Sequence, residues 1–77
     1  MEELLVTIAK GLVEDKDAVS VTADAPDEEG MVVYHLNVGP DDMGRVIGKQ
    51  GRIAKSIRSV MKAAATRQGT KIAVEID

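Results

Sequence analysis

The sequence contains no cysteine, phenylalanine or tryptophan, only two prolines and a single tyrosine. Without cysteine, the chain can form neither a disulfide framework nor a thiolate metal site. Without Phe and Trp, it lacks the stacking platforms of many proteins that bind single-stranded nucleic acid. No apolar run approaches the roughly 20 residues that span a bilayer, and Met1-Glu2-Glu3 is acidic where a signal peptide would be basic. We therefore expect a soluble, cytoplasmic protein.

A chain of 77 residues is expected to form one domain, residues 1–77, with a small core that association would help to stabilise. An enzyme of this size would be unusual. The only histidine, His35, is predicted to lie in mid-strand with no nucleophile or companion ligand at motif spacing, which favours a structural role. The adjacent carboxylates Asp41 and Asp42 are explained by helix capping. The sequence indicates no catalytic residue, metal site, cofactor or small-molecule substrate.

Charge is distributed unevenly along the chain. The net charge is −3, but residues 1–43 carry −9 and residues 44–77 carry +6, with no acidic residue from Gly44 to Val74. Such a segregation predicts a basic face that a polyanion can contact on a protein that is acidic elsewhere. An ordinary solvated helix face would explain the spacing of these lysines and arginines, but not the absence of acids among them.

Periodicity in the first half of the chain predicts three elements. Apolar residues at helical spacing indicate a helix over residues 2–13, and alternation indicates strands over 19–24 and 31–38. A turn over 25–30, with Pro26 and three acids, separates the strands. Because the strands are close in sequence, they should pair as an antiparallel hairpin.

The second half predicts two helices and a strand. Gly39 to Asp42 is typical of a helix start, and a short helix should follow as far as Ile47. A longer amphipathic helix begins after Gly51, closes at Gln68-Gly69, and precedes an alternating strand over residues 71–76. The expected apolar stripe of the longer helix is Ile53, Ile57, Val60, Met61 and Ala64.

Between these two helices lies Gly48-Lys49-Gln50-Gly51. Gly48 can end the first helix in a left-handed conformation, and Gly51 lets the backbone approach a ligand at the start of the next helix. Unpaired N–H groups and the helix macrodipole stabilise an anion there, while Lys49 adds a charge. A phosphate-binding P-loop is excluded because it needs four residues between its glycines and Ser or Thr after the lysine. The alternative is a simple turn between helices.

The order of elements and the segment Gly44 to Arg58, GRVIGKQGRIAKSIR, resemble a type II KH domain with an intact VIGxxG signature. The resemblance covers nearly the whole chain. It implies an α+β fold in which a three-stranded sheet carries three helices on one face. It also implies that single-stranded RNA, about four nucleotides of it, is held in a groove beside the glycine loop.

The resemblance and the loop chemistry together give the expected RNA contacts. Val46 and Ile47 are expected to divide between the core and the apolar floor of the groove, with Ile47 in the groove. Arg58 and Lys62, further along the helix, are expected to be ordinary solvated cations. The expected RNA-binding residues are Arg45, Ile47, Gly48, Lys49, Gln50, Gly51, Arg52 and Lys55.

The chain is also similar in length and in its opening residues to small free-standing bacterial KH proteins that bind RNA. That similarity implies a homodimer or a heterodimer with a larger KH protein, and a role in RNA regulation or chaperoning and in cell shape. The alternative function is a protein-interaction module whose main role is pairing. Net acidity, the small core and the Ala63-Ala64-Ala65 run favour it, with Val60 at the expected interface.

Overall fold

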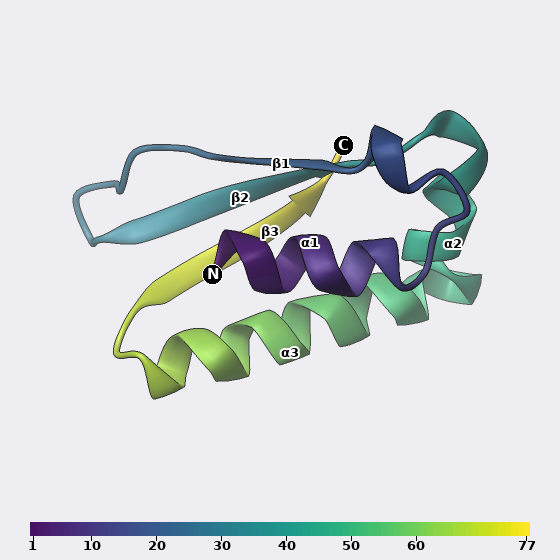
Figure 1. The fold of residues 1–77 in the computed structure, drawn as a ribbon. Helices are drawn as coiled ribbons and strands as arrows, with labels where there is room; N and C mark the ends of the chain where they lie inside the picture. Colours follow the sequence, from purple (N-terminus) through teal and green to yellow (C-terminus); the bar gives the residue numbers. More distant parts are fainter.

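Helices cover one face of a three-stranded sheet in the computed structural model, which describes residues 1–77 (Figure 1). The elements are α1 (Glu2–Lys10), β1 (Ser20–Ala23), β2 (Met31–Asn37), α2 (Met43–Ile47), α3 (Arg52–Arg67) and β3 (Lys71–Ile76). Three short 3₁₀ turns, Lys16–Ala18, Pro40–Asp42 and Lys49–Gly51, lie between them. The α+β fold class and the order of elements predicted from the sequence are confirmed.

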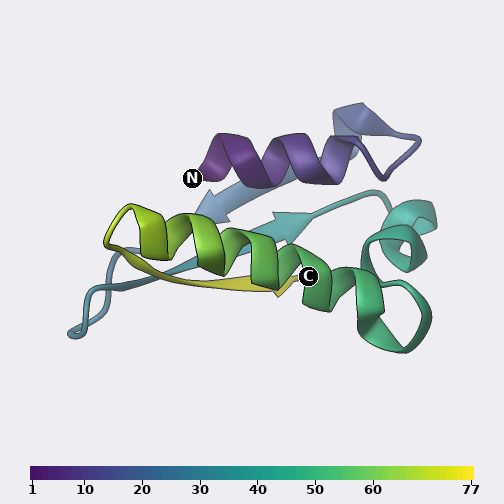
Figure 2. The same ribbon diagram turned by 90° about the horizontal axis from the view of Figure 1, so that it is seen from below.

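The sheet has the order β1-β2-β3. Strands β1 and β2 form the predicted antiparallel hairpin, with Ser20 opposite Asn37. Strand β3 pairs in parallel with β2, with Met31 opposite Lys71. A parallel pair requires a long crossover, and α2 with α3 provides it on the face where α1 also lies (Figure 2). The glycine loop is therefore the bend in the middle of this crossover.

One hydrophobic core lies between the sheet and the helices. Side chains alternate across each strand, so Leu36 and Val74 point toward the helices and are buried, whereas His35 and Glu75 lie on the uncovered face. Tyr34, the only aromatic residue, is partly buried and packs against the core. The core residues are Leu5, Ala9, Val13, Leu36, Val46, Ile57, Met61 and Val74.

The packing of α3 differs from the prediction. The helix buries Ala54, Ile57, Met61 and Ala65, whereas Val60 is 50% exposed. At 100° per residue the buried stripe is rotated by about 60° from the predicted one. The two small residues of the buried stripe, Ala54 and Ala65, lie at the margin away from Val60.

The first helix is shorter than predicted. It ends at Lys10, and the Gly11 N–H donates to the carbonyls of Thr7 and Ile8. Val13 is nevertheless buried, because the chain folds back over the core after the helix. None of the helices has the length and apolar character that a membrane span needs.

Candidate nucleic-acid interface

The loop between α2 and α3 turns the chain through three residues with positive φ. Gly48 has φ 74° and ψ 175°, Gln50 has φ 58° and ψ 24°, and Gly51 has φ 75° and ψ 15°. The left-handed conformation predicted for Gly48 is wrong. Its φ is positive as expected, but its ψ of 175° is that of an extended backbone. Gln50 and Gly51 take the left-handed conformation instead, and that brings the chain into α3.

Gly48 packs against the first turn of α3. A Cβ atom at this position would lie 2.9 Å from the Ile53 backbone nitrogen, which is too close for any side chain. A Cβ at Gly51 would meet nothing within 4 Å. Gly48 is therefore required by contact and by backbone conformation, whereas Gly51 is required by conformation alone and leaves the entry of α3 open.

The start of α3 has no internal anion. No side chain caps it and its first turn contains no acidic residue, although the helix is 16 residues long. Lys49, Gln50, Arg52 and Lys55 are all exposed around this point. The positive end of the helix dipole and three exposed cations thus lie at a helix start that has no acidic residue in its first turn, an arrangement that would favour an external anion.

Val46 and Ile47 point in different directions at the end of α2. Val46 is fully buried in the core, while Ile47 is 38% exposed. Seven of the eight predicted residues lie together at the end of α2, in the loop and in the first turn of α3: Ile47, Gly48, Lys49, Gln50, Gly51, Arg52 and Lys55.

Arg45 lies on α2 and is engaged by acids of the protein itself. Its Nη2 atom lies 2.9 Å from Glu14 Oε1, and its Nη1 atom lies 3.5 Å from Asp42 Oδ1. Arg45 is thus the one predicted site residue that the structure holds in ion pairs, while its side chain keeps 43% of its surface exposed.

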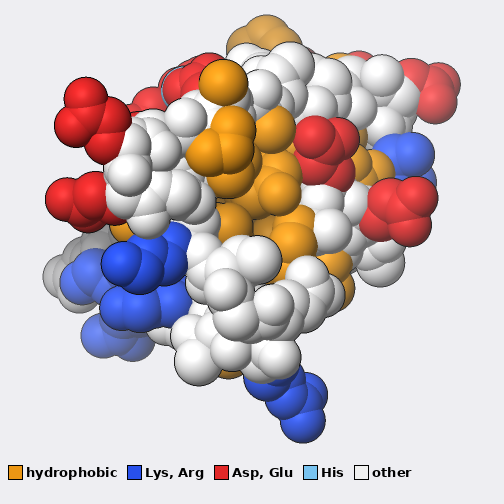
Figure 3. Space-filling view, turned by 90° about the vertical axis from the view of Figure 1, so that its left-hand side faces the viewer, with side chains coloured by type: hydrophobic (Ala, Val, Ile, Leu, Met, Phe, Trp, Pro, Cys, Tyr) orange, Lys and Arg blue, Asp and Glu red, His pale blue; other side chains and the backbone are white.

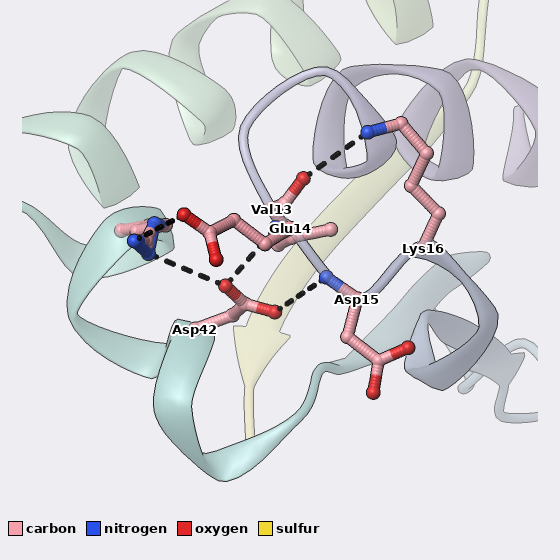
Figure 4. Close-up of polar contacts among 6 residues, drawn as sticks. Val13, Glu14, Asp15, Lys16 and Asp42 are labelled. Carbon is pink, nitrogen blue, oxygen red and sulfur yellow. Dashed lines mark hydrogen bonds and ion pairs between the residues drawn. The ribbon is translucent and has the colours of Figure 1, made fainter.

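Asp42 connects α2 to the segment after α1 (Figure 4). The backbone N–H groups of Glu14 and Asp15 each donate to its carboxylate at 3.1 Å, and Asp42 is only 3% exposed. The hydrogen bond from Glu14, followed by that from Asp15, lowers the pKa of Asp42. The predicted capping role is wrong, because Asp42 makes no side-chain cap to its own helix.

A groove of about 350 Å³ runs between α3 and β3, lined by Arg58, Lys62, Ile72, Ala73, Val74 and Glu75. Arg58 Nε donates to the Val74 carbonyl at 3.1 Å, so the prediction of an ordinary solvated cation is wrong for Arg58. Lys62 is exposed, as predicted. Figure 3, viewed from the end with the β1–β2 turn, shows most basic side chains gathered on the α3 side and most acidic ones elsewhere.

Solved structures support the fold. A crystal structure of Era from Aquifex aeolicus bound to GDP.AlF4- matches 97% of this chain and 28% of its own length, with a TM-score of 0.65 and 19% identity. A structure of Era in complex with MgGDPNP and nucleotides 1506–1542 of 16S ribosomal RNA matches equally well. At this identity the likeness concerns the fold alone.

Sequence comparisons are more specific. The RNA-binding protein KhpA of Clostridium acetobutylicum is 50% identical over 76 residues, which cover 99% of each chain. KhpA of Caldanaerobacter subterraneus is 49% identical with the same coverage, and KhpA of Listeria monocytogenes is 46% identical over 99% of this chain and 97% of the relative. Residues 2–76 match the family described as KhpA/KhpB, KH domain. The chain belongs to the KhpA/KhpB family of KH domains.

Proposed function

We propose that this protein binds single-stranded RNA and holds its backbone at the loop Gly48 to Gly51. The observation that carries the proposal is the uncapped start of α3, where exposed cations converge and no acid of the protein is present. Membership of a family whose relatives are named RNA-binding proteins supplies the class of anion. RNA binding, and not catalysis, is the activity we assign.

Each residue of the loop has a distinct role in this proposal. The glycines let the sugar-phosphate backbone approach the loop, Lys49 pairs with a phosphate, and the amide of Gln50 donates a hydrogen bond. Arg52 and Lys55 contact the neighbouring phosphates from the first turn of α3. Ile47 offers aliphatic contact to a base. KH domains hold about four nucleotides in this manner.

The groove between α3 and β3 continues this surface away from the loop. Its basic residue Lys62 and its aliphatic wall at Ile72 suit a strand whose phosphates face α3 and whose bases face β3. Because no aromatic ring is available for stacking, binding by one copy should be weak and show little sequence preference.

Association is the second function we propose. An apolar groove between α1 and α3 is lined by Ile8, Leu12, Ile53, Ser56, Ile57 and Val60. Val60 and Leu4 are exposed large hydrophobic residues on these two helices. A second copy, or a larger KH protein of the KhpB kind, would cover this surface and present a second RNA groove, which raises the overall affinity.

Fluorescence anisotropy with short single-stranded RNA tests the RNA site. The Lys49→Asp, Gln50→Asp double variant replaces attraction by repulsion, and we expect about 100-fold weaker binding. The wild-type log affinity should fall with log salt by about 0.7 for each phosphate that is neutralised. Lys10→Asp, which reverses a charge on α1, is the control and should bind nearly as well as wild type. Equal binding by the folded double variant and the wild type would contradict the proposed RNA site.

The association surface is tested separately by Val60→Glu. This substitution places a charge in the apolar groove, so sedimentation velocity should show a loss of self-association or of pairing with the larger KH protein. The Lys49→Asp, Gln50→Asp variant should associate normally. If Val60→Glu associates like the wild type, the α1–α3 surface is not the interface.

A further inference from the structure

A cluster of four polar side chains lies on the uncovered face of the sheet, apart from the glycine loop, and one of the four, Glu75, also lines the groove between α3 and β3. His35 projects from the middle of β2. Its Nδ1 atom lies 3.0 Å from Asp77 Oδ2 and 3.5 Å from Glu75 Oε2, and its Nε2 atom lies 3.0 Å from Asp24 Oδ2. The cluster thus joins the segments at the ends of β1 and β3 to β2.

The spacing of three of these groups suits a metal ion. The ligand atoms of His35, Glu75 and Asp77 all lie within 4.8 Å of one another. Two ligands that are each about 2.1 Å from a zinc ion are separated by about 3.0 Å at a right angle and about 3.4 Å at the tetrahedral angle. The distances from Nδ1 to the two carboxylates, 3.0 Å and 3.5 Å, lie near these values.

Asp24 is placed to orient the imidazole. A histidine that binds a metal through one ring nitrogen usually donates its other N–H to a carboxylate or a carbonyl group. The Asp24 carboxylate lies beside Nε2, and a proton held there leaves the Nδ1 lone pair directed at Glu75 and Asp77. This arrangement distinguishes the cluster from a simple group of surface acids, which has no nitrogen ligand and no orienting partner.

We propose that His35, Glu75 and Asp77 form a binding site for a divalent transition metal of the zinc type, with Asp24 as the positioning residue. One imidazole and two carboxylates favour Zn²⁺, Co²⁺ or Ni²⁺ over Mg²⁺ and Ca²⁺, which prefer ligand sets of oxygen alone. The side chain of His35 is 24% exposed and the carboxylates more so, which gives the ion access from solvent and leaves coordination positions for water.

The bound ion would connect the sheet rather than act on RNA. It would tie the end of β3 to β2, and through Asp24 to the segment after β1. A proton competes with the ion for the imidazole, because a histidine binds a metal through a deprotonated ring nitrogen. Binding is therefore measured at pH 8, where the neutral imidazole is more abundant.

Isothermal titration calorimetry of the untagged full chain with Zn²⁺ tests the site. We expect one equivalent to bind, and the Glu75→Gln, Asp77→Asn double variant to lose at least about tenfold in affinity. Asp24→Asn should lose about 10–100-fold, the usual effect of removing an orienting partner. The Glu28→Gln, Glu29→Gln variant changes the net charge equally in the β1–β2 turn and is the control, which should bind like the wild type.

Co²⁺ substitution gives a second readout, since imidazole and carboxylate coordination produces visible absorption bands that change in His35→Gln. Circular dichroism verifies that each variant is folded. Absence of Zn²⁺ binding by the wild type would overturn the proposal. Equal affinity of the control and the Glu75→Gln, Asp77→Asn variant would overturn it as well, because the ion would then bind elsewhere.

Discussion

Two segments of the chain bend at glycines with positive φ: the turn between β1 and β2 and the loop between α2 and α3. They differ in whether a carboxylate of the protein accepts hydrogen bonds from their backbone N–H groups. In the turn, Asp27 Oδ1 accepts hydrogen bonds from the Glu29 and Met31 N–H groups at 2.9 Å. In the loop, no side chain caps the start of α3, and the exposed residues include Lys49, Arg52 and Lys55.

The difference is the one we expect between a self-contained turn and the proposed binding site. In the β1–β2 turn a carboxylate of the chain already accepts hydrogen bonds from the backbone N–H groups. A phosphate would therefore find no free N–H donor there. At the start of α3 there is no such carboxylate and cations are present instead. The backbone N–H groups and the positive end of the helix dipole therefore remain available to a ligand. We interpret the RNA phosphate as the external counterpart of Asp27.

Gly48→Ala should have the largest effect on this comparison. The variant places a Cβ against the Ile53 backbone and retains a strained φ, so we expect a loss of about 2–4 kcal/mol in the free energy of unfolding. Gly30→Ala, at φ 83° in the turn with nothing within 4 Å, should lose only about 1–2 kcal/mol. Urea denaturation measures both. Equal losses would show that the contact with Ile53 has no energetic weight.

Asp42, like Asp27, accepts hydrogen bonds from two backbone N–H groups, but its carboxylate is buried. Its pKa in the folded protein is lowered, so it stabilises the fold above its ordinary value of 3.8, and this contribution is lost as pH falls through the lowered pKa. Thermal unfolding between pH 6 and 2 should therefore show a steep loss of stability below about pH 4.

The Asp42→Asn variant should be less stable than the wild type at pH 6 and should lose less stability on acidification. An amide oxygen accepts from one N–H, but its NH₂ group opposes the other. Asp41→Asn, at the exposed neighbouring position, is the control that retains the steep acid dependence. The same pH profile in Asp42→Asn and the wild type would exclude Asp42 as the source.

Asp27→Ala should have a moderate effect that is confined to stability. The substitution removes the acceptor of two N–H groups in an exposed turn, which water can partly replace, so we expect a loss of about 1 kcal/mol. Anisotropy should show unchanged RNA affinity. A change in RNA affinity would mean that the turn and the loop are not the independent regions that the comparison assumes.

Glu14→Gln should have the smallest effect and the opposite sign. Its carboxylate pairs with Arg45 at 2.9 Å and competes for this cation with an RNA phosphate. An exposed pair is worth at most about 1 kcal/mol, so release of Arg45 should tighten RNA binding by up to about fivefold. Glu3→Gln on α1 changes the net charge equally and serves as the control. Weaker binding by Glu14→Gln would show that the ion pair positions Arg45 for RNA.

Local patterns predicted most of the fold. The mid-strand position predicted for His35 is confirmed. So are the hairpin and the order of elements. These features depend on side chains a few positions apart, whose arrangement is fixed by the strand and helix repeats.

Contacts between distant segments were not predictable. Asp42 was interpreted as a helix cap because its neighbours in sequence suit one, but its partners lie 27 and 28 residues away. Arg58 was assigned to solvent because the carbonyl that it meets belongs to a later strand. The carboxylates around His35 come together only once β3 pairs with β2. Helical periodicity likewise left open which margin of the apolar stripe would face the sheet, and Val60, which belongs to the predicted stripe, is 50% exposed.

The hydrogen bond from Arg58 to the Val74 carbonyl also has a consequence for how molecules of this protein meet at high concentration. Strand β3 forms an outer edge of the sheet, where unpaired backbone groups can recruit a strand from another molecule. The guanidinium group occupies the middle of that edge and adds a charge there, while the opposite edge, β1, is only four residues long. Both edges thus carry features that disfavour strand addition, and we expect the protein to resist growth into aggregated sheets.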